Sequence, residues 1–197
     1  KRFPGAMVTG VDMMEEEIEA CRVIGEKARI RNAYFKVADI RDLEYENTFD
    51  LITCVDILEH IEDDSAALEK LFSALTPGGL LFLHIPSLYR RYPVFKENLN
   101  FDVPTHVRTG YNMEDMAAKT EKTGFTLVES GKTYGFLETL ANNISYMITG
   151  AREKNRELYA VVFPLLNLIS WLGRYAKPGN LGAGIYFLLV KNEKPTT

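Results

Sequence analysis

Cysteine and tryptophan are scarce in this sequence, which has two cysteines and one tryptophan among 197 residues. Cys21 and Cys54 lie far apart, in segments with a periodic apolar pattern, so we expect buried free thiols and no disulfide framework. Free thiols are typical of a reducing compartment, which predicts a cytoplasmic protein.

The sequence also lacks an excess of basic charge. Lys and Arg number 23 against 27 Asp and Glu, which gives a net charge of −4. A strong nucleic-acid binder normally carries a basic footprint, so we expect no nucleic-acid partner.

Long apolar runs are absent too. The most apolar stretch, residues 158–173, contains Pro164 and is too short to span a bilayer, so we expect a buried or interfacial helix. The chain begins at Lys1 without a signal-peptide pattern, and we expect the native N-terminus to lie further upstream.

Strand-like and helix-like segments alternate over the first three quarters of the chain. Strand patterns cover residues 7–12, 33–39, 49–56, 80–86 and 125–130, and helical patterns cover 15–28, 63–75 and 112–125. A helical region at 135–176 and a last strand at 184–192 follow. This order favours a doubly wound, mostly parallel α/β sheet with helices on both faces.

Three of the expected strands end in aspartate, at Asp12, Asp39 and Asp56. Ligands of open α/β sheets bind outside the carboxyl ends of the strands, where a carboxylate can accept hydrogen bonds from both hydroxyls of a ribose. Asp39 is followed by Ile40, a pair that suits the amine and the ring of an adenine. The alternative is that each aspartate only caps a helix or turn.

Five segments closely resemble, in their order along the chain, successive motifs of class I S-adenosylmethionine-dependent methyltransferases: VTGVD, VADIRDLEYENTFDLI, CVDILEHIED, LTPGGLLFLHIPS and YNMEDMAAKTEKTGF. The final GIYFLLVKN resembles the family's antiparallel last strand. The resemblance implies a Rossmann-like core formed by residues 1–130 and 183–192. Residues 131–182 would then form a helical cap on the substrate side.

The same resemblance implies a binding site for S-adenosylmethionine. Asp12 would bind the ribose hydroxyls, with Met13 beside it, and Asp39 and Ile40 would contact the adenine. Three residues at the end of the fourth family strand would line the methionine part and the methyl-transfer position: Cys54, Val55 and Asp56.

One family motif is missing from the sequence. The first family strand ends in a glycine-rich loop of the form Asp-x-Gly-x-Gly-x-Gly, which lets the backbone approach the cofactor, and nothing like it precedes Asp12. That strand is central in the family, so without it we expect a divided sheet with unpaired strand edges.

A second group of candidate residues lies in DILEH, where Asp56, Glu59 and His60 would share one side of a helical turn. Together with His106, they form a reasonable ligand set for a divalent metal. The pattern resembles the E-x-x-E-H sets of two metal-dependent O-methyltransferase groups. One makes ubiquinone precursors, and the other methylates the terminal 2′-hydroxyl of small RNAs.

Two alternatives to the metal remain open. His60 or His106 can act as a general base near the methyl acceptor. Otherwise, Glu59 and His60 only pair locally, because similar segments occur in methyltransferases without a metal. His84 lies inside an apolar strand, and we expect a structural role for it.

Acceptor specificity is expected from segments outside the core. Tyr89, Arg90, Arg91 and Tyr111 are candidate substrate contacts, and the two arginines can bind a carboxylate or phosphate or form a solvated surface pair. Tyr92 and Phe95 follow in the same segment, and Tyr134, Phe136 and Tyr146 form a pocket wall or pack the cap.

Residues 158–172 can lie on a bilayer and deliver a lipid-like acceptor, but a helix buried against the sheet or in a homodimer contact fits the pattern better.

We therefore expect a methyltransferase that acts on a small molecule, most plausibly at oxygen. A Rossmann-type oxidoreductase gives no reason for CVDILEH or LTPGG. A non-catalytic methyltransferase-like remnant, unable to bind the cofactor, is the alternative from a different class.

Overall fold

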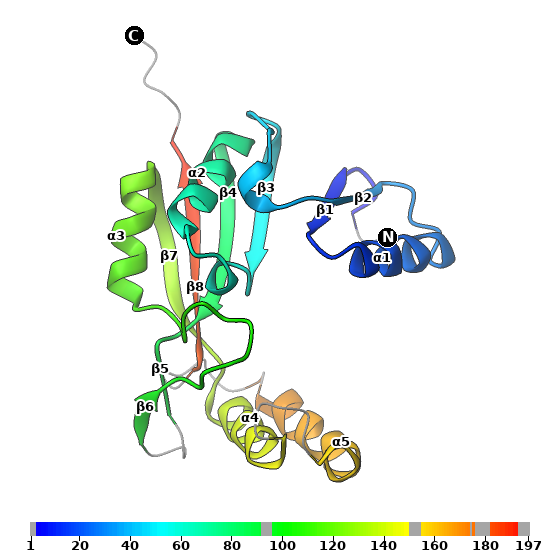
Figure 1. Ribbon diagram of the computed structural model, residues 1–197, viewed down its shortest axis with the longest axis vertical. Coiled ribbons are helices and arrows are strands. Elements are labelled where there is room, and N and C mark those ends of the chain that lie inside the picture. The colour runs from blue at the N-terminus through cyan, green and yellow to red at the C-terminus, as the bar shows by residue number, and fades with distance from the viewer. Residues whose placement is uncertain (1–2, 92–95, 150–154, 174, 176–181, 193–197) are drawn as a thin grey trace.

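The computed structural model describes residues 3–91, 96–149, 155–173, 175 and 182–192. Tyr92 and Phe95 lie outside these residues. The chain forms a central unit, an N-terminal βαβ unit and a helical hairpin (Figure 1).

The central unit is a four-stranded sheet in the order β3 (Phe49–Val55), β4 (Leu75–Pro86), β8 (Gly184–Lys191) and β7 (Phe125–Thr133). β3 and β4 are parallel, and β8 runs antiparallel to both β4 and β7. β3, β4 and β7 therefore run in the same direction. The antiparallel direction of β8 confirms the expectation of a mostly parallel sheet with an antiparallel last strand.

Helices α2 (Asp64–Ala74) and α3 (Met113–Thr123) pack on each other and against this sheet. Alternate residues of β4 and β8 point toward the core, since Leu81, Leu83 and Phe187 are fully buried while Phe82 and Tyr186 are only half-buried. Period-two burial of this kind is what a strand with one covered face requires.

Local signals account for the helix ends. The Asp63 side chain accepts a hydrogen bond from Ala66 N at the start of α2, and Asn112 does the same for Glu114 N at the start of α3. Gly124 ends α3 in the left-handed region, at φ 109°. β4 is longer than expected, because the TPGG turn is absorbed into the strand with a register shift opposite Phe49 and Leu51.

The N-terminal unit consists of β1 (Val8–Asp12), α1 (Glu15–Lys27) and β2 (Ala33–Val37). β1 and β2 pair in parallel and form a sheet of their own. Within the described residues, β1 pairs only with β2 and β3 pairs only with β4. The expected division of the sheet is confirmed, and Val8, Val11, Leu51 and Val55 are exposed on the strands beside it.

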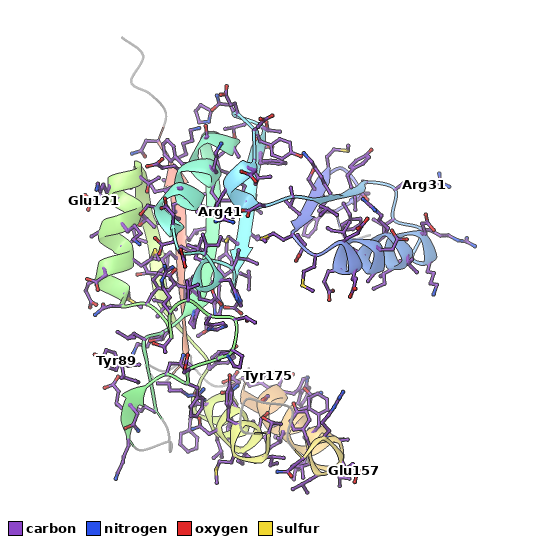
Figure 2. The ribbon with its side chains drawn as sticks, viewed as in Figure 1. Arg31, Arg41, Tyr89, Glu121, Glu157 and Tyr175 are labelled. Carbon is purple, nitrogen blue, oxygen red and sulfur yellow. The ribbon has the colours of Figure 1, made fainter. Side chains whose placement is uncertain are left out.

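The link between the two units contains the short helix η1 (Ile40–Asp42), which packs against α2. Figure 2 shows Arg41, from η1, beside the central unit. The segment that follows β2 is therefore held by the central unit.

Beyond β4, a small hairpin of β5 (Tyr89–Arg91) and β6 (Glu97–Leu99) precedes α3. Helices α4 (Phe136–Thr149) and α5 (Arg156–Gly173) pack on each other and project from the lower end of the sheet (Figure 1). One of the possibilities expected from the sequence, burial of this helix against the sheet, is therefore wrong, because α5 packs on α4. In the part of the chain that is described, no helix is both long enough and apolar enough to cross a membrane.

Candidate functional site

The aspartates at the ends of β1 and β2 lie at one edge of the N-terminal unit. Asp12 pairs in register with Val37, and its backbone oxygen accepts a hydrogen bond from Ala38 N, directly before Asp39. Asp12 Oδ1 also accepts from Met14 N at 2.8 Å. The predicted ribose and adenine residues, Asp12 and Asp39, are therefore close neighbours. Met13 is exposed and Ile40 is half-buried beside them.

Asp39 forms an ion pair with Arg41. Its carboxylate accepts from Arg41 N at 2.8 Å and from the guanidinium at 2.6–3.1 Å. These side-chain hydrogen bonds lower the pKa of Asp39 below its ordinary value, so the carboxylate stays charged. Asp12 and Asp39 thus cap local turns, and both carboxylate oxygens of Asp39 already accept hydrogen bonds from Arg41.

Asp56 follows β3 with φ 51°, in the left-handed region. Its Oδ1 accepts from His84 Nδ1 at 2.8 Å, and His84 Nε2 lies 3.1 Å from the hydroxyl of Thr133. With Nδ1 donating, Nε2 accepts the Thr133 hydroxyl proton. Asp56, His84 and Thr133 therefore form one hydrogen-bonded chain across the ends of three strands.

The other two residues of the predicted methyl-transfer position differ in exposure. Cys54 is buried, and burial raises the pKa of its thiol to about 12. Val55 is exposed. Cys21 is exposed as well, which corrects the expectation that both thiols are buried.

Three of the four predicted metal ligands converge. One ligand atom from each of Glu59, His60 and His106 lies within 4.8 Å of the others, and the imidazole rings are 4.6 Å apart in an edge-to-face arrangement. Asp56 is not part of this group, because its carboxylate turns to His84. Glu59 and His60 belong to the short helix η2 (Leu58–His60), and His106 comes from the loop before α3.

The polar atoms of this trio fit a cation. Glu59 is 1% exposed, and its Oε2, like His106 Nδ1, is buried without a hydrogen-bond partner among the described residues. His60 Nδ1 donates to Thr105 O at 3.1 Å, which leaves Nε2 as an acceptor. One carboxylate oxygen and two imidazole nitrogens are a common ligand set for Zn²⁺ and related divalent ions.

Burial also shifts the pKa values of two members of the trio. Desolvation raises the pKa of Glu59 and lowers the pKa of His106, which the neighbouring His60 lowers further. A neutral imidazole is the form that binds a metal, and a cation would offset the cost of a buried carboxylate at Glu59.

The candidate substrate residues lie in different environments. Arg90 is 3% exposed, so it is not a solvated surface residue, and its guanidinium lies 4.5 Å from the Phe101 ring and 4.8 Å from the Tyr146 ring. It donates to Asn142 Oδ1 at 2.6 Å and to Asn143 Oδ1 at 2.7 Å, which ties β5 to α4.

Tyr89 and Arg91, on either side of Arg90, are exposed. Tyr111 is buried, and its hydroxyl donates to Leu58 O at 2.9 Å, so it faces the protein interior. Tyr134 and Phe136 are exposed, while Tyr146 stacks on Phe101.

Sequence reasoning missed Arg108 and Asp64, which form an ion pair at 2.9 Å beneath η2. Their separation in sequence hides this contact, and only the adjacency of Arg108 to His106 could have drawn attention to it.

Comparisons with known proteins bear on the family and the fold of the chain. A relative, the ubiquinone biosynthesis O-methyltransferase of Xanthomonas oryzae pv. oryzae, is 37% identical over 81 residues, which cover 40% of this chain and 34% of the relative. The chain therefore spans about a third of the length of that relative.

Two solved structures share the fold at low identity. Phosphoethanolamine N-methyltransferase 2 of Haemonchus contortus, in complex with S-adenosyl-L-methionine, has a TM-score of 0.66 at 19% identity, over 96% of this chain and 44% of that one. A putative sarcosine dimethylglycine methyltransferase from Galdieria sulphuraria has a TM-score of 0.65 at 13% identity, over 95% and 71%. The model of a methyltransferase domain family matches residues 1–156, and the chain belongs to this family.

Proposed function

We propose that this chain is the core of an S-adenosylmethionine-dependent methyltransferase that methylates a hydroxyl of a small molecule with the help of a divalent cation. The observation that carries the proposal is the convergence of Glu59, His60 and His106 on one point, with two buried ligand atoms unpartnered among the described residues. The O-methyltransferase relative supports oxygen as the methylated atom.

The residues at the strand ends each contact a different part of the cofactor. Asp12, with Met13 beside it, binds the ribose hydroxyls, and Asp39 and Ile40 contact the adenine. Cys54, Val55 and Asp56 line the methyl-transfer position. When bound, S-adenosylmethionine supplies an activated methyl group, so the protein has only to align the acceptor oxygen and remove its proton.

The trio acts on the acceptor. Glu59, His60 and His106 would hold the cation, which lowers the pKa of a coordinated hydroxyl. Without a cation, His60 Nε2 is the better candidate base, because Thr105 O holds the proton on its other nitrogen. Exposed Tyr89 and Arg91 lie on β5, beyond the end of β4, where they can contact the substrate.

Calorimetry on the full chain tests both parts. We expect heat on titration with S-adenosylhomocysteine and, separately, with Mn²⁺. Glu59→Gln should weaken Mn²⁺ binding by about 10- to 100-fold, as loss of a ligand or its support typically does. Exposed Glu62→Gln is the matched control and should bind Mn²⁺ normally.

The S-adenosylhomocysteine titration tests the methyltransferase proposal, and the Mn²⁺ titration tests the metal proposal separately. Absence of heat with millimolar S-adenosylhomocysteine contradicts the methyltransferase proposal for this chain and favours the non-catalytic alternative. Absence of heat with Mn²⁺, or equal effects of E59Q and E62Q, contradicts the metal and leaves a histidine base.

A second proposal concerns the acceptor, which we infer to be lipid-like and delivered from an anionic membrane surface at α5. Residues 158–173 carry no charge, and the side facing away from α4 is apolar and exposed at Val161, Leu165 and Leu168. Figure 2 shows Glu157 and Tyr175 at opposite ends of the helix. The sequence from 150 to 178 contains five basic and two acidic residues, in a chain of net charge −4.

Vesicle co-sedimentation tests this surface. The chain should sediment with phosphatidylglycerol-containing vesicles more than with phosphatidylcholine alone, and Val161→Glu should abolish the difference. Val128→Glu, at an exposed site on β7, is the control. Equal sedimentation of all forms contradicts the proposal, and self-association without lipid, lost in V161E, assigns the helix to a homodimer contact.

A further inference from the structure

A partly buried ionic cluster adjoins the backbone of the metal-ligand trio. Its centre is Asp64, the first residue of α2, which is 4% exposed. Asp64 Oδ2 accepts from Arg108 Nη1 at 2.9 Å and lies 3.0 Å from the Tyr111 hydroxyl oxygen, whose proton goes to Leu58 O, and Oδ1 accepts from Lys119. The cluster joins α2, α3 and the loop that carries His106.

Arg108 reaches from this cluster to the backbone on both sides of Glu59 and His60. Its Nη1 donates to Leu58 O at 3.0 Å, and its Nη2 donates to Glu62 O at 2.8 Å. These carbonyls bracket the segment that holds two of the three ligands. One planar guanidinium thus fixes both ends of a short, otherwise irregular turn.

The third ligand is tied to the same segment. Val107 N, between His106 and Arg108, donates to Glu59 O at 2.9 Å. The Tyr111 hydroxyl adds a second hydrogen bond to Leu58 O, at 2.9 Å. The His106 loop and the η2 turn are therefore held together through backbone atoms next to the ligands, which fixes the spacing of the imidazole rings.

We propose that Arg108 is a positioning residue that holds Glu59, His60 and His106 in the arrangement a divalent cation requires. The inference rests on the proposed function, because that proposal supplies the cation. The position of Arg108 itself is given by its hydrogen bonds to Leu58, Glu62 and Asp64. Arg108 contacts no ligand side chain in the described hydrogen bonds; it acts through the backbone carbonyls at 58 and 62. Asp64 keeps the guanidinium in place, since the buried Asp64 carboxylate needs a charged partner and Arg108 provides one at 2.9 Å.

Lysine cannot replace arginine in this position. An ammonium group can pair with Asp64, but it lacks the rigid fork that spans two carbonyls and a carboxylate. Lys119 provides the matched control, because it contacts the same carboxylate and makes no described contact with Leu58 or Glu62. A purely structural role of the cluster therefore predicts similar effects for both residues, whereas a positioning role does not.

The experiment compares Arg108→Lys with Lys119→Met in three measurements: Mn²⁺ affinity by calorimetry, nuclear Overhauser contacts between the His60 and His106 rings in metal-free protein, and thermal unfolding. R108K should bind Mn²⁺ about 10- to 100-fold more weakly, the range typical when a group that holds metal ligands in place is lost. It should also lose the contact between the rings. K119M should keep the Mn²⁺ affinity and the ring contact, even if its melting temperature falls by as much as that of R108K.

Each alternative result has a defined meaning. Native Mn²⁺ affinity and native ring contacts in R108K overturn the positioning role, as do losses in both variants that follow melting temperature alone. If the wild-type chain binds no Mn²⁺, the metal proposal fails by itself, and the ring contacts still decide on Arg108. Their loss in R108K with retention in K119M supports the role, and any other pattern contradicts it.

Discussion

At the residue scale, the two cysteines differ in what surrounds them. Cys54 is 4% exposed and its pKa is raised to about 12 by burial, so at pH 8 it remains a protonated thiol. Cys21, on α1, is exposed. A thiol reagent such as iodoacetamide should therefore modify Cys21 and spare Cys54 in the native chain. Mass spectrometry after digestion checks this, with urea-unfolded protein as the control in which both react.

The pair of Asp39 and Arg41 predicts a pH dependence at acid pH. Hydrogen bonds from Arg41 lower the pKa of Asp39 below its ordinary 3.8, so the pair stabilises the fold above that value. The contribution is lost as pH falls through the lowered pKa of the folded state. Arg41→Gln should return the Asp39 pKa toward 3.8 in an NMR titration and slightly lower stability at pH 7, where the pair contributes in full, while leaving stability below the lowered pKa unchanged. An unchanged titration would contradict the ion pair.

Asp56 shows where sequence reasoning stops at this scale. The spacing of Asp56, Glu59 and His60 predicts one side of a helical turn, and the last two do meet at the trio. Asp56 instead adopts φ 51°, which a pattern of residue types does not reveal, and its carboxylate meets His84 from a different strand. Long-range partners such as His84, Thr133 and Arg108 depend on strand order, which spacing alone leaves open.

At the element scale, α3 is the helix whose ends the sequence states most clearly. Asn112 caps its first turn through Glu114 N at 3.0 Å. Asn112→Ala should lower the free energy of unfolding by about 1 kcal/mol, measured by urea denaturation, because one amide of the first turn loses its acceptor. Glu121 lies exposed on the same helix and is labelled in Figure 2. As the control, Glu121→Ala should change the free energy of unfolding by less than about 0.5 kcal/mol. Equal effects would show that the cap contributes nothing.

Elements with a local sequence signal could be predicted, whereas features that depend on tertiary pairing or packing could not. Periodicity locates α1, α2 and α3, caps mark the starts of α2 and α3, and continuous apolar runs locate β3 and the buried part of β4. The extension of β4 back to Leu75 depends on its pairing with β3, so no local signal gives it. The helical pattern of 158–173 predicts α5 correctly, but its packing on α4 and not on the sheet is a tertiary result.

At the scale of the whole molecule, the two halves of the expected cofactor site belong to different units. Asp12 and Asp39 follow strands of the N-terminal unit, and Asp56 follows β3 of the central unit. The units do not share a sheet in the described residues. The missing glycine-rich segment predicted this division, because the described part of the chain provides no further strand that pairs with both β1 and β3.

The division predicts unequal local stability. In the described N-terminal unit, Ile18 is the one apolar side chain that is fully buried, while Val23, Ile24 and Tyr34 are exposed. The central unit instead shares a continuous core of buried residues from β3, β4, β7, β8, α2 and α3. A two-stranded sheet with one helix is marginal by itself, so the N-terminal unit should open without the rest of the chain.

Hydrogen exchange with NMR detection measures this opening strand by strand. Amides of Gly10 and Lys36, which both face the partner strand in the β1–β2 ladder, should exchange on the order of a hundredfold faster than those of Leu83 and Phe187 in the β4–β8 ladder. Both pairs lie within regular ladders, so a difference reports the opening of a unit and not a missing hydrogen bond. Equal protection would mean that the units unfold together. Saturating S-adenosylhomocysteine should narrow the difference, because the proposed ligand contacts Asp12 and Asp39 on one unit and Asp56 on the other.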